Sequence, residues 1–213
     1  MASLPAAPAR PQLLRRAMTL ELVTLGWNVV EGVIAVAAAA AAGSIALLAF
    51  GVDSFVESAS AAVMIWRLRS ETRGLDEQAI EALDRRAHKL VALSLFALAA
   101  YVATDSLRAL GTGERPSPSL VGIVLLAVSL ALMVWLARAK ARTARALSSR
   151  ALAADAFQTT ACWWLSLIAL VGLGLNATFG WWWADPMAAL GMVYFLVAEG
   201  REAWRGEDCC DAA

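Results

Sequence analysis

The sequence predicts an all-α integral membrane protein with six transmembrane helices and both termini in the cytoplasm. Apolar residues make up 60% of the 213 residues, against about half in a typical soluble domain. The mean hydropathy is +0.63. Apolar stretches of about 20 residues, the length that crosses a bilayer as a helix, recur along the whole chain. Little of the chain remains for a separate soluble domain.

Six spans follow in order along the chain. The predicted ranges are 19–41, 44–66, 89–110, 119–137, 151–176 and 184–199. The first two need about 75 Å of helix at 1.5 Å per residue, which is too long for one crossing, so we predict a hairpin with a tight turn at Gly43-Ser44. The last span begins at Asp185-Pro186, with Asp185 as the N-cap and Pro186 in the first turn.

The basic residues predict the orientation. With six spans, all but two of the 18 Lys and Arg residues lie on one side, and only Arg108 and Arg115 lie opposite. Lys140 belongs to this basic side, in the connection after the fourth span. The positive-inside rule then places both termini in the cytoplasm, and we expect a bacterial-type plasma (inner) membrane. Topology and anionic lipid explain the basic clusters, so we expect no nucleic-acid partner.

Three domain segments follow from these spans: an N-terminal cytoplasmic arm over 1–18, a six-helix transmembrane domain over 19–204, and a short cytoplasmic tail over 205–213. The tail contains Cys209 and Cys210, which suit either metal capture or lipidation.

Two acids lie within the second span. Asp53 and Glu57 are four residues apart, so they share one face of a helix. An ionised acid at the bilayer centre costs about 2.5–3.5 kcal/mol on insertion scales, so this pair implies a compensating cation. The other interpretation is that the acids only hydrogen-bond neighbouring helices.

The fifth span has a second polar face, formed by Asp155, Gln158 and Cys162 at i, i+3, i+7 spacing. Carboxylates and a thiolate together suit a borderline divalent ion such as Zn²⁺, with Asp53, Glu57 and Cys162 as ligands, completed by Asp155 or Gln158. Such ligands release protons when they bind metal, which permits exchange of metal for H⁺. Cys162 as a small buried apolar residue, and Gln158 as an interhelical hydrogen-bonding residue, remain open.

The first span carries Glu21, Asn28 and Glu31 close to one stripe. Glu21 is expected near the cytoplasmic end, where it snorkels or pairs with Arg16. Glu31 lies deeper and is a candidate proton relay, with Asn28 as polar support. No phosphate-binding loop or nucleophile–base arrangement indicates an enzyme.

The segments 43–49, 52–57, 149–157 and 184–186 together resemble the transmembrane domain of the cation diffusion facilitator family of divalent-metal/proton antiporters. They are similar to the family's second-helix signature, the entry to its fifth helix and the start of its sixth. The resemblance implies a proton-coupled secondary transporter that moves a divalent cation, Zn²⁺ or a similar ion, out of the cytoplasm. It also implies a homodimer.

The resemblance assigns Asp53 and Glu57 to the family's second-helix metal pair, with Glu57 in place of the more usual Asp. Where family members usually carry a His and an Asp four apart in the fifth helix, this chain has Gln158 and Cys162. Asp155 matches an acid that is common at its position but is not usually counted as a ligand. The family's usual cytoplasmic metal-binding domain is not expected here, since the sequence ends at Ala213, so the membrane helices would hold the dimer.

Two other functions are compatible with these differences from the usual family pattern. One is a non-transporting membrane protein that keeps a degenerate metal site for sensing or partner assembly. The other is a transporter of something other than a metal ion, in which the acids serve only as proton sites.

Overall fold

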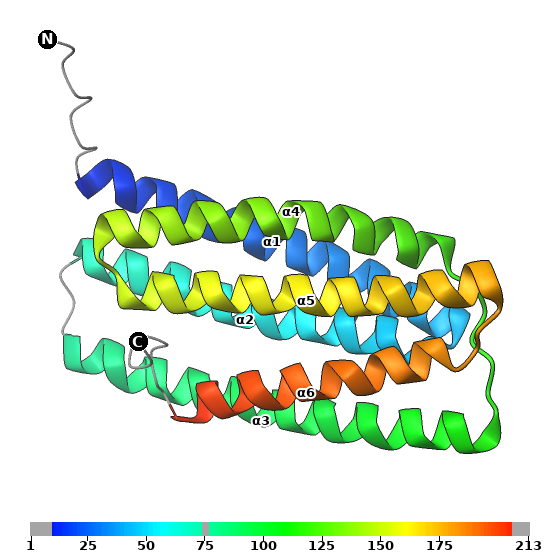
Figure 1. Cartoon of the computed structure of the whole chain (residues 1–213). Helices are drawn as coiled ribbons and strands as arrows, with labels where there is room; N and C mark the ends of the chain where they lie inside the picture. Colours follow the sequence, from blue (N-terminus) through cyan, green and yellow to red (C-terminus); the bar gives the residue numbers. More distant parts are fainter. Residues whose placement is uncertain (1–9, 74–76, 206–213) are drawn as a thin grey trace, which may run out of the picture.

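The computed structural model describes residues 10–73 and 77–205 of the chain. These residues form six α-helices (Figure 1), namely α1 (Arg10–Ala42), α2 (Ile45–Arg73), α3 (Glu77–Thr112), α4 (Leu120–Leu147), α5 (Arg150–Phe179) and α6 (Ala184–Arg205). The predicted all-α, six-helix fold is confirmed. Cys209 and Cys210 lie outside the described residues.

The surface of the bundle is apolar and part of its interior is polar. Side chains such as Leu90, Leu107 and Tyr194 are more than 45% exposed, while Glu21 and Glu31 on α1 are completely buried. Among the described helices, α1 to α5 are each long and apolar enough to cross a membrane, and α6 does not reach that hydropathy. An apolar surface around a polar interior is the arrangement that lipid requires when charged groups are retained inside a protein.

The helices run alternately up and down, and α2 is central (Figure 1). It packs against α1, α3, α5 and α6, while α4 packs against α1 and α5. The α3–α6 pair lies along one side of the group formed by α1, α2, α4 and α5 (Figure 1). The start of α1, the end of α6 and the α4–α5 connection lie at one end of the bundle, which we call the termini end.

The turn between α1 and α2 is tight, as predicted. Gly43 has a φ of 68°, and the amides of Gly43 and Ser44 both donate to the carbonyl of Ala39. The prediction that Asp185 is the N-cap of the last helix is wrong, because α6 already begins at Ala184. The Asp185 carboxylate instead accepts hydrogen bonds from the Ser44 hydroxyl (2.5 Å) and the Ile45 amide (2.9 Å), so it caps the N-terminus of α2.

Small residues let α1 and α2 approach closely. A Cβ on Gly51 would lie 2.9 Å from the Ala35 Cβ and 3.0 Å from the Val36 amide nitrogen. Small residues allow such backbone contact in membranes, where van der Waals packing supplies much of the association energy. This contact places the start of the polar face of α2 against α1.

Gly51→Val is therefore expected to destabilise the bundle by about 1–3 kcal/mol, the usual cost of overpacking. Gly26→Val is the matched control, since a Cβ on Gly26, also within a helix, would meet nothing within 4 Å. Thermal unfolding of the purified proteins in one detergent measures the difference. Equal midpoints for the two variants would contradict the close α1–α2 contact.

Several helices extend beyond the predicted spans, and one extension changes the interior. The prediction that Lys140 lies in a connection is wrong, because α4 continues to Leu147 and Lys140 is completely buried within it. The predicted fourth span stops at residue 137, because the average hydropathy falls where the charged residues begin. The buried positions Met133, Leu136, Lys140, Thr143 and Leu147 nevertheless keep the three- and four-residue spacing of one helix face.

Candidate functional site

The two acids of α2 are buried together inside the bundle. Asp53 is 3% exposed and Glu57 is 4% exposed. Their spacing places both on one face, and the two carboxylates interact electrostatically. Glu57 lies about 18 Å along α2 at 1.5 Å per residue, which is near the middle of a membrane-spanning helix.

The Glu57 carboxylate is buried without a conventional hydrogen bond. Neither of its oxygens makes a hydrogen bond of ordinary geometry to a described residue, and the same is true of both polar atoms of the Asn28 amide. The side chains of Asn28 and Cys162 nevertheless lie beside this carboxylate. Buried polar groups are nearly always paired, so the Glu57 carboxylate is a candidate for binding a further ligand.

Glu31, in contrast, is fully engaged by the protein. Ser54 donates to its Oε1 at 2.9 Å, and both Trp27, at 2.5 Å, and Ser129 donate to its Oε2. These donors come from α1, α2 and α4, so Glu31 joins three helices. Its carboxylate still interacts electrostatically with Glu57 and Asp53. Its predicted role as a proton relay stays a prediction.

The polar face of α5 runs past the α2 acids. Cys162 is 2% exposed and lies beside Glu57. One turn away, the Gln158 amide donates to the Ser60 hydroxyl of α2 at 3.3 Å. Of the predicted ligands, Glu57 and Cys162 therefore lie beside each other across α2 and α5. However, no three His, Cys, Asp or Glu side chains in the described part of the chain are arranged closely enough to hold a metal ion. The predicted ligand set is adjacent but not closed around one point.

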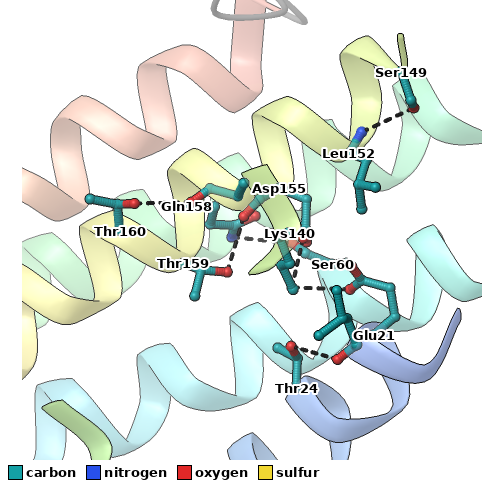
Figure 2. Close-up of polar contacts among 12 residues, drawn as sticks. Glu21, Thr24, Ser60, Lys140, Ser149, Leu152, Asp155, Gln158, Thr159 and Thr160 are labelled. Atoms are coloured by element: carbon teal, nitrogen blue, oxygen red, sulfur yellow. Dashed lines mark hydrogen bonds and ion pairs between the residues drawn. The ribbon is translucent and has the colours of Figure 1, made fainter. Parts of the chain in front are cut away.

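Asp155, the remaining predicted ligand, has a cation beside it. Its Oδ2 lies 2.6 Å from the Lys140 ammonium, which also donates to Glu21 Oε2 at 3.1 Å. Figure 2 shows these three side chains converging from α1, α4 and α5. The expectation that Glu21 snorkels or pairs with Arg16 is wrong, because Glu21 is completely buried and its carboxylate pairs with Lys140. We refer to Glu21, Lys140 and Asp155 as the buried triad.

Sequence reasoning missed two charged residues of the interior. Hydropathy places Lys140 in a connection, whereas the helical spacing of the neighbouring apolar residues places it on the buried face of α4. Glu199, on α6, is partly buried, and it interacts with Gln158 and electrostatically with Asp53 and Glu57. Glu199 is the last residue of a predicted span, where an acid is expected to face the membrane surface and gives no sign of a site. Only the packing of α6 against α2 and α5 brings it to the site.

The arrangement gathers acidic groups beside a thiol and an amide, although they are not closed around one point. Asp53, Glu57 and Glu199 provide carboxylate oxygens, Gln158 an amide and Cys162 a sulfur, all within or beside the protein interior. Several negative groups held together away from water repel one another unless cations or protons neutralise them. The fold and this site define a membrane protein that handles cations.

Comparison with known proteins agrees with this class. The family model of the cation efflux transmembrane domain matches residues 22–205. The chain belongs to the cation efflux family, the cation diffusion facilitators, and is a membrane cation transporter of that kind. A search of curated proteins found no match.

Proposed function

We propose that this protein exports a divalent transition-metal ion, Zn²⁺ or a similar ion, from the cytoplasm in exchange for protons. Asp53 and Glu57 are the primary ligands and proton carriers, Cys162 is the third ligand, and Gln158 is a supporting ligand. Asp155 acts through the triad described above. Both termini face the cytoplasm, as the basic residues at the termini end favour. The protein acts as a homodimer.

The observation that supports this proposal most strongly is the state of Glu57. Both of its carboxylate oxygens are buried beside Asn28 and Cys162 without a conventional hydrogen bond to a described residue, and Asp53 is buried on the same helix face. An acid that only joined helices would be bonded to its neighbours, as Glu31 is. An acid that alternately binds a metal ion and a proton needs oxygens that the protein leaves available.

Ion binding requires the ligands to move closer together. Because the predicted ligands are not gathered around one point here, we propose that the ion draws α5 towards α2 and that protonation of the acids releases it. Cys162 and Glu57 are already neighbours, so the change needed between these helices is small. The exchange of metal for protons then alternates two arrangements of the same helices.

The test is metal flux into proteoliposomes that carry an imposed pH gradient. Zn²⁺, Mn²⁺, Fe²⁺, Co²⁺ and Cd²⁺ are screened with the wild type, Asp53→Asn and Glu57→Gln, and internal pH is recorded together with metal uptake. Saturable flux of at least one ion, with proton counter-movement that both substitutions abolish, is the expected result. Folded protein that moves none of these ions would overturn the proposal and favour a sensing or assembly role.

Cys162→Ser provides a test of ion preference. A thiolate favours softer ions, so its loss is expected to weaken Cd²⁺ binding by at least about tenfold while changing Mn²⁺ binding much less. Isothermal titration of the purified protein with each ion measures this ratio, in a chain whose Cys209 and Cys210 are replaced by Ser. Equal effects on the two ions would show that Cys162 only fills space.

A further inference from the structure

The buried triad contains more negative than positive groups. The Lys140 ammonium lies 2.6 Å from Asp155 and 3.1 Å from Glu21, so one cation serves two acids. The second oxygen of Glu21, Oε1, is buried and makes no hydrogen bond of ordinary geometry to a described residue, and the Glu21 and Asp155 carboxyl groups interact with each other. All three residues are at least 92% buried. If the ammonium left, two facing carboxylates would remain, which is the charge that one divalent cation neutralises.

The triad is placed between the termini end and the α2 acids. Asp155 lies on the same face of α5 as Gln158 and Cys162, and it precedes Cys162 by about 10 Å of helix on the side of the termini end. The Lys140 ammonium also interacts electrostatically with Glu57. An ion that moves along this face from the termini end therefore meets Asp155 before it meets Glu57.

We propose that Glu21 and Asp155 form a second binding position for a divalent cation, which the ammonium of Lys140 occupies in this structure and from which an arriving ion displaces it. This inference rests on the proposed function for the direction of ion movement. Lys140 acts as a tethered competitor. While its ammonium is in place, a second cation is excluded by charge, and when an ion takes its place the two carboxylates hold that ion near Glu57.

The first experiment measures a gain of binding in a chain that lacks the primary site. Asp53→Asn/Glu57→Gln is the background, and binding of Mn²⁺ to purified protein is followed by the loss of its free-ion electron paramagnetic resonance signal. Mn²⁺ prefers oxygen ligands, so the cysteines interfere little. Adding Lys140→Met to the background is expected to create about one new Mn²⁺ site per chain, because the competitor is removed.

Two controls make the gain specific. Lys140→Arg keeps a cation between the acids and is expected to bind no more Mn²⁺ than the background. Asp155→Asn added to the Lys140→Met chain is expected to remove the new site. Folded Lys140→Met protein that gains no Mn²⁺ binding would overturn the inference. Since the primary acids are absent from every chain compared, that result would leave the proposed transport function standing.

A second variant tests the inference if Lys140→Met does not fold. Glu21→Gln keeps the Lys140–Asp155 ion pair and the primary site, but it leaves the second position with one carboxylate. Stopped-flow measurement should show slower association of Mn²⁺ with the primary site and an unchanged equilibrium dissociation constant. An association rate equal to that of the wild type would contradict the second position. Absence of any Mn²⁺ binding in the wild type would instead contradict the proposed function.

Discussion

Lys140→Met is expected to lower the free energy of unfolding by about 3–5 kcal/mol, the usual cost of removing one partner from a buried charge cluster. Methionine is close to lysine in length, so packing within α4 changes little. The substitution leaves Glu21 and Asp155 facing each other without a cation in the protein interior. Reversible unfolding in mixed micelles of SDS and a mild detergent, without divalent ions, measures the loss.

The matched control is Arg138→Met, which removes a basic residue of the same helix from an exposed position. It is expected to change stability by less than about 1 kcal/mol. The neutral chain Glu21→Gln/Lys140→Met/Asp155→Asn should recover most of the loss, because it carries no unpaired charge. If the neutral chain were as unstable as Lys140→Met, packing rather than charge would explain the effect.

Glu57→Gln is expected to weaken binding of the transported ion by more than about 100-fold, or at least about 2.7 kcal/mol. The reason is that both Glu57 oxygens are buried without a conventional hydrogen bond to a described residue, so we expect them to bind the ion directly. Glu31→Gln removes the same chemical group from a neighbouring helix. Because Trp27, Ser54 and Ser129 hold Glu31, we expect only about a tenfold effect, typical of a group that supports ligands from outside.

Equilibrium binding of Zn²⁺ and Mn²⁺ to the two purified variants provides this comparison, with folding checked by gel filtration. The prediction is the ratio between the losses of ion affinity in the two variants. Both variants lose a buried charge, so the general cost of that loss cancels in the ratio. A loss of affinity in Glu31→Gln equal to or larger than that in Glu57→Gln would place the ion on α1. The ligand assignment would then be wrong, although the protein would remain a cation transporter of its family.

The sequence by itself determined the features that depend on one helix at a time. Six helices, the hairpin turn at Gly43-Ser44 and the common face of Asp53 and Glu57 follow from apolar length, glycine geometry and helical spacing, and the structure confirms them. These features are local, since the 3.6-residue period fixes the relative direction of two side chains on one helix. The family resemblance likewise rests on local motifs, and the match over 22–205 confirms it.

Only the tertiary structure decided which charges meet. Lys140 on α4 and Asp155 on α5 lie on either side of the connection between these two helices. Their ion pair shows that Lys140 points inward and that Asp155 already has a cation beside it. Asp185 caps α2 rather than its own helix, and Glu199 joins the α2 acids from α6. The physical reason is that the rotation and axial offset of each helix are set by the sum of its contacts with all its neighbours. These contacts between helices cannot be read from the residue spacing along a single helix.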